Sequence, residues 1–198
     1  MSSKKVLITL AGISLILSIS FYIYLFQREL QTPKHLSFFG MAPDFVLTDS
    51  NGDEFSSQKL QGKVWVADFI FTTCGNICPI MTQNMAQLYR SYKLMNDVSW
   101  VSISVNPETD TPEVLQNYAK KFDANPKQWH FLTGTRDNIT DITVKGFKMG
   151  SVDEPVFHSG KFVLVDRHMR VRGYYEGTED ADITKLFKDL AKLLQERE

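Results

Sequence analysis

Cysteine is scarce in this sequence, with two residues among 198, and both lie in one short segment. A network of disulfides cannot hold the fold together, and a four-cysteine zinc centre is not available. An excess of one charge is missing as well, because acidic and basic residues are interspersed and the net charge is −1. Nucleic acid is therefore not an expected partner. The hydrophobic share of 43% is that of a globular protein.

The long hydrophobic run lies at the amino terminus, where residues 6–26 carry no charged side chain. As a helix, this run would measure roughly 30 Å, about the thickness of the hydrocarbon core of a bilayer. A cleaved signal peptide is the alternative interpretation, but the run continues apolar from Phe21 to Phe26, past a weak cleavage site at residues 18–20. Because no cysteine lies directly after the run, a lipoprotein anchor is not expected. We predict a transmembrane anchor.

The flanking charges predict the orientation of this anchor. Lys4 and Lys5 precede the run, and the positive-inside bias then keeps the amino terminus in the cytoplasm. The rest of the chain is expected on the periplasmic or extracytoplasmic side of the membrane. The predicted organisation is a cytoplasmic tail at 1–5, the single-pass anchor at 6–26, a linker at 27–40 and a domain at 41–198.

The domain is predicted to alternate strands with helices. Apolar and β-branched runs predict strands, periodic apolar positions predict helices, and turn residues at 49–52 and 166–169 predict two hairpins. This order predicts an α/β sandwich around a central mixed sheet flanked by helices. The expected strands are 63–71, 100–105, 129–132, 161–165 and 171–175, and the expected helices start at 79 and span 112–122, 138–148 and 183–195.

The two cysteines are four residues apart, Cys74 and Cys78, between the buried strand 63–71 and the helix that Pro79 begins. Binding sites collect at such strand ends in open α/β sheets, and a helix N-terminus lowers the pKa of a thiol. A structural disulfide across so short a loop would contribute only about 2 kcal/mol, against ~4.7 kcal/mol for a hundred-residue loop. Two interpretations stay open, a redox-active dithiol and a site for a soft metal.

Two thiolates and one imidazole would form a donor set suited to copper. The sequence has four histidines, and position alone does not decide among them. His35 lies in the linker, His130 in a predicted strand and His168 in a predicted hairpin turn, whereas His158 directly precedes a strand.

Four segments resemble the characteristic blocks of the Sco/SenC family, in the same order. The resemblance extends from about Ala42 to the C-terminus, behind one anchor helix. It implies a thioredoxin-like fold and one copper ion, Cu(I) or Cu(II), bound by Cys74, Cys78 and His158. It also implies a metallochaperone that receives copper from a donor protein and delivers it to the dinuclear copper centre of cytochrome c oxidase, with the copper-binding subunit as partner. The four segments are Phe69–Met81, Ser104–Glu113, Trp129–Gly134 and His158–Asp166.

Some members of that family are instead thiol–disulfide reductases, so a membrane-anchored oxidoreductase with Cys74 and Cys78 as its redox pair is the alternative. Only in that case would the chain be an enzyme. A thioredoxin-like peroxidase would need an arginine beside one activated cysteine, and no arginine can be assigned. The sequence departs from the common family pattern at Gly75-Asn76, where many members have Pro-Asp, and at Phe157, where many have aspartate. A missing carboxylate beside the histidine would alter the affinity for copper.

Overall fold

The computed structural model describes residues 12–24, 36–149 and 160–196, and the chain divides into two units, Met1–Leu36 and a domain that starts at Ser37. Residues 12–24 form a helix whose large apolar side chains are exposed. The predicted anchor at 6–26 extends beyond these residues at both ends. Among the residues that the structure describes, no helix is both long enough and apolar enough to cross a membrane.

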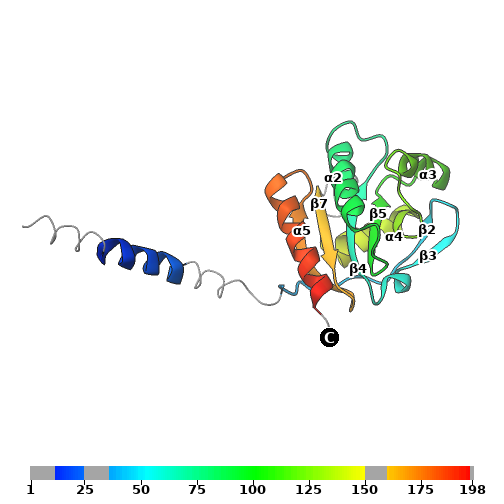
Figure 1. The fold of residues 1–198 in the computed structure, drawn as a ribbon. Coiled ribbons are helices and arrows are strands. Elements are labelled where there is room, and N and C mark those ends of the chain that lie inside the picture. Colours follow the sequence, from blue (N-terminus) through cyan, green and yellow to red (C-terminus); the bar gives the residue numbers. More distant parts are fainter. Residues whose placement is uncertain (1–11, 25–35, 150–159, 197–198) are drawn as a thin grey trace, which may run out of the picture. The chain divides into compact units, whose positions relative to one another are not determined.

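Eight strands of the described domain form one sheet, in the order β1-β8-β7-β4-β5-β6-β2-β3 (Figure 1). The pairs β4–β5 and β5–β6 are parallel, and the other neighbouring pairs are antiparallel. The predicted mixed sheet and both predicted hairpins, β2–β3 and β7–β8, are thus confirmed. The strands are β1 (Gly40–Met41), β2 (Val46–Asp49), β3 (Glu54–Ser56), β4 (Val64–Ile70), β5 (Val98–Ser104), β6 (Trp129–Thr133), β7 (Lys161–Val165) and β8 (Arg170–Glu176).

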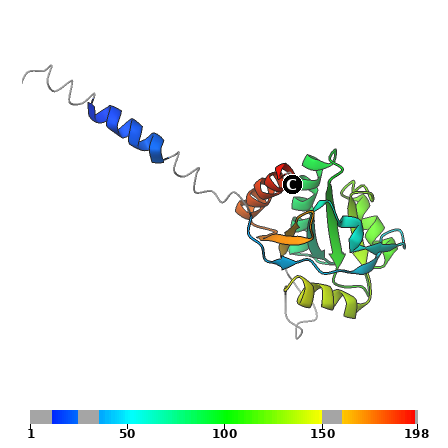
Figure 2. The same cartoon turned by 90° about the horizontal axis from the view of Figure 1, so that it is seen from below.

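Helices cover both faces of this sheet (Figure 2). On one face, aromatic contacts join α2 to β5 and α3 to β6, and they also join α2 to α5. On the other face, Phe147 follows a helical segment and packs edge-on against Trp65 and Phe69 of β4. The helices are α2 (Ile77–Tyr92), α3 (Pro112–Lys120), α4 (Arg136–Thr140), which continues into a π-helical turn at Asp141–Gly146, and α5 (Asp180–Gln195), with a short 3₁₀ helix at Ser57–Leu60.

The central strand β4 is buried along its whole length, as its apolar run predicts. Alternation of side chains along a strand places Trp65, Ala67 and Phe69 on the face covered by the α4 segment. Val66, Asp68 and Ile70 therefore face the layer formed by α2, α3 and α5. An acidic side chain thus lies inside the core, on the same side as the start of α2.

Three details differ from the sequence-based expectation. Helix α2 starts at Ile77, two residues before Pro79, so that Cys78 belongs to its first turn. The predicted helix 138–148 is an α-helical piece followed by a π-helical turn. Strand β1 has no predicted counterpart, because a two-residue edge strand leaves no periodic pattern in the sequence.

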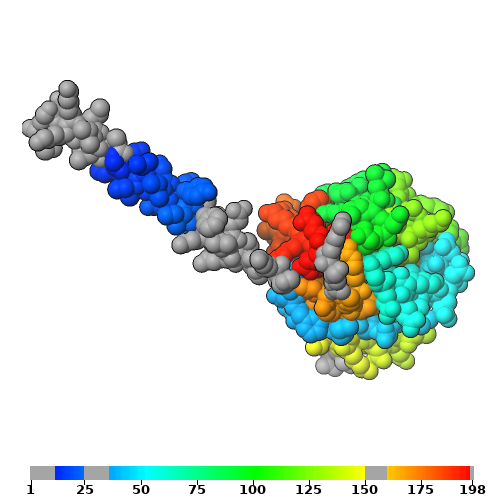
Figure 3. Space-filling view, turned by 60° about the horizontal axis from the view of Figure 1, so that its bottom comes forward, coloured from blue at the N-terminus to red at the C-terminus, as the bar shows by residue number. Residues whose placement is uncertain are grey.

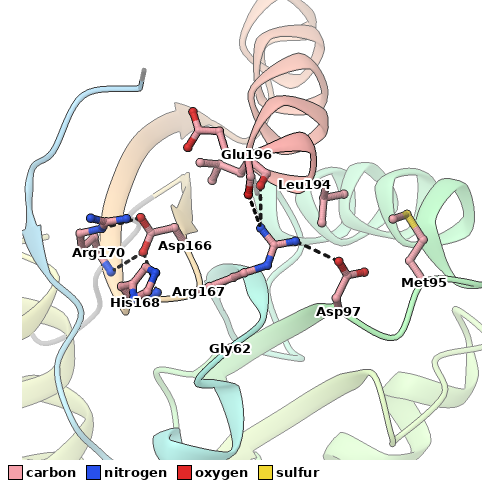
Figure 4. A pocket seen from close by; sticks show the side chains of 10 residues that line it. Gly62, Met95, Asp97, Asp166, Arg167, His168, Arg170, Leu194 and Glu196 are labelled. Atoms are coloured by element: carbon pink, nitrogen blue, oxygen red, sulfur yellow. Dashed lines mark hydrogen bonds and ion pairs between the residues drawn. The ribbon is translucent and has the colours of Figure 1, made fainter. Parts of the chain in front are cut away.

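A pocket of about 700 Å³ lies between the end of α5 and the β7–β8 turn (Figure 4). Arg167 crosses it, donating hydrogen bonds to the Leu193 carbonyl at 2.7 Å and to the Asp97 carboxylate at 3.0 Å. Asp166 accepts a hydrogen bond from Arg170 at 2.7 Å. These charges pair with one another, and Arg167 satisfies a carbonyl that the end of a helix would leave without a partner. The contacts connect the β7–β8 turn to α5.

Candidate functional site

The two cysteines lie where β4 passes into α2. Cys74 is in the loop after β4 and Cys78 is in the first turn of α2, and the side chains are 8% and 3% exposed. Both are free thiols. The backbone N–H of Cys74 donates to the carbonyl of Phe71 at 3.1 Å, which folds the loop back toward the helix. Pro79 follows in the first helical turn, where its missing N–H costs no hydrogen bond. The pair lies at the predicted junction of the strand and the helix, but Cys78 is inside the first helical turn and not in the loop before it.

Cys74 is set up to carry negative charge. Asn76 precedes α2 and makes no side-chain cap, so the N–H groups of the first turn are left to other acceptors. Burial alone would raise the pKa of the Cys74 thiol. Hydrogen bonds from the backbone of Asn76, Cys78 and Ile77, together with one from the Cys78 side chain, outweigh burial and lower the pKa. The thiolate of Cys74 is the form that ligates a metal or attacks a disulfide.

The surroundings of Cys78 favour the protonated thiol, in contrast to those of Cys74. The pKa of the Cys78 thiol is raised to about 12, mainly by burial. A hydrogen bond from the backbone of Phe71 offsets part of the increase, and the neighbouring charges of Cys74 and Asp68 contribute to it. The thiol of Cys78 therefore keeps its proton in the metal-free, reduced protein. One cysteine of the pair is reactive and the other holds a proton.

This asymmetry predicts unequal alkylation of the reduced protein. We expect iodoacetamide to modify Cys74 at a pH below that needed for an ordinary thiol, while Cys78 stays unmodified near neutral pH. Mass spectrometry of the peptides after timed labelling at a series of pH values measures both rates. Cys74→Ser and Cys78→Ser serve as controls that leave a single reacting thiol. Equal pH midpoints for the two cysteines would contradict the assigned roles.

Asp68 is a fully buried acid close enough to the site to act on Cys78. Neither of its carboxyl oxygens has a hydrogen-bond partner of ordinary geometry among the described residues. Burial raises the pKa of Asp68 to about 7, and the nearby Ser102 hydroxyl offsets only part of that increase. Our sequence analysis missed this residue. The signal is a single acid within the otherwise apolar run of β4, a residue type that is almost never buried without a partner.

A hydroxyl pair links the start of α2 to α3. The Thr82 hydroxyl donates to the carbonyl of Cys78 at 2.8 Å and lies 3.0 Å from the Tyr118 hydroxyl. Since Thr82 has a single hydroxyl hydrogen, Tyr118 is the donor of the second bond. The pKa of Tyr118 is raised to about 12, mainly by burial and in smaller part by the charges of Asp68 and the cysteines. Tyr118 therefore remains a protonated donor that holds the first turn of α2 in place.

Asp110 organises the loop on the other side of Cys74. Its buried carboxylate accepts from the backbone N–H of Thr72 at 3.1 Å and from the Thr72 hydroxyl at 2.6 Å. It also accepts from the Ser104 hydroxyl at 2.6 Å. Because Ser104 ends β5, these bonds fix the segment before Cys74 to the neighbouring strand. Asp110 belongs to the family-like segment 104–113, but the residues alone do not indicate its structural role.

Asp110→Asn is expected to destabilise the reduced domain by about 2 kcal/mol, because an amide nitrogen would face donors that now meet a carboxylate. Thr72→Val is the matched control, and it should cost less, about 1 kcal/mol, since Asp110 would keep its bond to Ser104. Urea unfolding at neutral pH measures both changes. A loss for Asp110→Asn no greater than that for Thr72→Val would contradict this role.

The histidines are placed very differently from one another. His130 is largely buried on β6, with its ring 4.4 Å from that of Phe55, and burial and the charges of nearby lysines lower its pKa to about 4. His168 is exposed in the β7–β8 turn, as predicted. His35 and the predicted ligand His158 lie outside the described residues. Within the described ranges, no cluster of three or more His, Cys, Asp or Glu residues could hold a metal ion.

A mixed sheet between two helical layers, with a cysteine pair where its central strand enters a helix, defines a thioredoxin-like dithiol domain (Figure 1). The family model for SCO1/SenC matches residues 34–195. The chain belongs to the SCO1/SenC family.

Three known proteins illustrate the relationship. The SCO1 protein homolog of Bacillus subtilis is 35% identical over 152 residues, which cover 74% of this chain and 79% of the relative. The structure of BsSco, a Sco family cytochrome c oxidase assembly protein with a disulfide switch, is 31% identical and covers 82% of this chain and 99% of its own, with a TM-score of 0.70. Copper-bound ScoI of Arabidopsis thaliana is 28% identical and covers 79% of this chain and 99% of its own, with a TM-score of 0.65.

Proposed function

We propose that this chain binds one copper ion through Cys74, Cys78 and His158. The observation that supports the proposal is the pair of free, buried thiols at the start of α2, where backbone N–H groups lower the pKa of Cys74. Thiolates are soft donors that suit Cu(I), and an added imidazole suits Cu(II). His158 directly precedes Ser159-Gly160 and strand β7, which is hydrogen-bonded to β4, the strand that leads to Cys74.

Delivery of this copper to the dinuclear copper centre of cytochrome c oxidase is the proposed role. It is supported by membership of a family that includes a cytochrome c oxidase assembly protein and by the copper bound in a related structure. The partners in this proposal are the copper-binding subunit of the oxidase and a protein that donates copper. Transfer would proceed by exchange of ligands, since thiolates of donor and acceptor proteins compete for the same ion.

We further propose that the chain is anchored in the membrane by residues 6–26, with residues 1–5 in the cytoplasm and 27–40 as the linker. The support is the charge-free run behind Lys4 and Lys5. The domain, proposed at 41–198 and described from Ser37, would then lie on the extracytoplasmic side. A cytochrome c oxidase subunit with its copper centre on that side would be within reach.

Copper titration of the full chain in detergent tests the metal site. The fully reduced protein is expected to compete with a Cu(I) chelator for one copper ion per chain. The oxidised protein, with Cys74 and Cys78 joined in a disulfide, should bind none, because the disulfide sulfurs have lost the charge that attracts the metal. Equal binding by the two forms would contradict a thiolate site.

A second function, thiol–disulfide exchange, is favoured by the unequal pKa values of the two cysteines. The Cys74 thiolate would attack a partner's disulfide, form a mixed disulfide and release one partner thiolate. Cys78 would lose its proton and attack Cys74, releasing the second partner sulfur. The partner gains two electrons from the cysteine pair, one proton from Cys78 and one proton from solvent, and the cysteine pair becomes a disulfide. Reduction of a peptide disulfide by copper-free protein, absent in Cys74→Ser, would support this function.

A further inference from the structure

The segment that opens the domain exposes three large apolar side chains. Phe38, Phe39 and Met41 are 61%, 49% and 57% exposed. No other four-residue stretch of the described domain exposes three large apolar side chains. Single exposed apolar residues are ordinary, whereas three within four positions are a concentration of the kind that interaction surfaces show. These three residues are called the β1 surface.

Backbone bonds hold the β1 surface against the sheet. The N–H of Phe39 donates to the carbonyl of Val171 at 3.0 Å, and the N–H of Ala42 donates to the carbonyl of Met169 at 2.7 Å. The ring of Phe39 also meets the edge of Tyr174, with centroids 5.5 Å apart. In Figure 3, the blue segment that contains these residues lies on the outside of the domain, beside the orange β7–β8 hairpin. The exposure is thus a property of the folded domain.

The sequence also limits how far this surface can be from the proposed anchor. Ten residues, 27–36, separate the end of the apolar run from Ser37, and even fully extended they span at most about 36 Å. A compact domain of this size has a radius of gyration of about 15 Å, so its diameter is comparable to that length. The β1 surface, which begins one residue after Ser37, therefore cannot move farther than about 36 Å from the end of the proposed anchor. Tethering raises its effective concentration there to the millimolar range, so a weak interaction suffices.

We propose that Phe38, Phe39 and Met41 insert into the interfacial layer of the bilayer that anchors the chain. The proposal rests on the proposed anchor at 6–26. Aromatic and aliphatic side chains partition into this layer to a depth of about 5–10 Å when their polar backbone is satisfied, and here β8 satisfies part of it. The contact would dock the domain on the membrane in one orientation.

The topology gives that orientation. Met41 pairs with Arg170 at the start of β8, next to the β7–β8 turn. Because β7 is antiparallel to β4, with Val165 opposite Trp65, this turn lies at the amino end of β4. Cys74 follows the carboxyl end of the same strand. A domain resting on the β1 surface would therefore hold Cys74 away from the lipid, toward the extramembrane part of a partner.

The test uses the full chain reconstituted in vesicles whose lipids are brominated on their acyl chains close to the headgroup. Phe38→Trp adds a fluorescent tryptophan to the β1 surface. Val114→Trp, the control, adds one to the partly exposed start of α3. The three native tryptophans are buried and common to both variants. Relative to vesicles without bromine, Phe38→Trp should lose the emission of its added tryptophan, and Val114→Trp should not.

The outcomes distinguish failure of the proposed lipid contact from failure of the proposed anchor. If the chain floats with the vesicles after a carbonate wash but Phe38→Trp is not quenched, the β1 surface does not enter the lipid and this inference fails, while the anchor stands. Quenching that appears equally in Val114→Trp also overturns it. If the chain does not float with the vesicles, the anchor fails and the inference with it. If Phe38→Trp is not quenched by the lipid but its emission shifts when the oxidase subunit is added, the surface binds a protein partner instead and the inference fails.

Discussion

His158→Ala is expected to lower the affinity for Cu(II) by at least about 100-fold, since changing even an outer partner of a metal ligand costs 10–100-fold. It should also remove most of the sulfur-to-copper charge-transfer absorption. Two thiolates alone give Cu(II) only part of a donor set. Thiol–disulfide exchange needs the two sulfurs and not the imidazole, so the variant should still cycle between dithiol and disulfide. Titration followed by visible absorption, alongside thiol counting, measures the two properties separately.

His168→Ala is the matched control for this experiment. His168 is exposed in the β7–β8 turn, at the end of β4 opposite Cys74, and its loss should leave copper binding near normal. His130→Ala is a second control, although it also removes the packing on Phe55. Wild-type affinity and absorption in His158→Ala would show that the proposed ligand set is wrong. A wild type that binds no copper but reduces disulfides would favour the oxidoreductase.

Asp68→Asn is expected to remove a pH-dependent loss of stability of about 4 kcal/mol. The pKa of Asp68 is about 7 in the folded domain, against 3.8 for an unperturbed carboxyl. Between these values the unfolded chain releases the proton while the folded domain keeps it, so stability falls as the pH rises. Below this window the carboxyl is neutral in both states, and above it the full penalty is present. Each pKa unit corresponds to about 1.4 kcal/mol.

Urea unfolding of the reduced protein at about pH 4.5 and about pH 8 tests this expectation. The free energy of unfolding of Asp68→Asn should increase relative to wild type by about 3 kcal/mol between the two conditions. Comparing the two proteins cancels the titration of shared groups that Asp68 does not influence. Asp44→Asn, at an exposed position, is the control and should show the wild-type dependence on pH. Parallel curves for wild type and Asp68→Asn would refute the proposed ionisation of Asp68.

The central part of the fold could be predicted from the sequence because local patterns agree with long-range packing there. The apolar run of β4 is buried as predicted, and Met81, Met85 and Leu88, which recur at helical spacing, form the buried face of α2. The position of Cys74 and Cys78 follows from these two elements, because the junction of a buried strand and a helix is a local feature. The resemblance of four segments in the same order, 69–81, 104–113, 129–134 and 158–166, indicated the family.

Other features depend on contacts that no local pattern encodes. The pairing of Gly40 with Val171 joins distant segments, and neither residue has a periodic neighbourhood that indicates the pair. The opposite pKa shifts of Cys74 and Cys78 follow from the three-dimensional placement of N–H groups and of Asp68. The role of Asp110 likewise appears only once β5 and the loop before Cys74 lie side by side. The proposed ligand His158 remains a prediction from the family resemblance.

The first strands of the domain pair with strands that the ribosome synthesises much later. β1 lies beside β8, and β2 pairs with β6, with Thr48 opposite Thr133. A ribosome adds roughly 5–20 residues per second, so the opening strands exist for roughly ten seconds before β8 is made. Pairings between distant segments are also slow to form, because a long loop must close first. The sheet is therefore completed only after nearly the whole chain has been synthesised, so that its edge strands are among the last parts of the domain to find their partners.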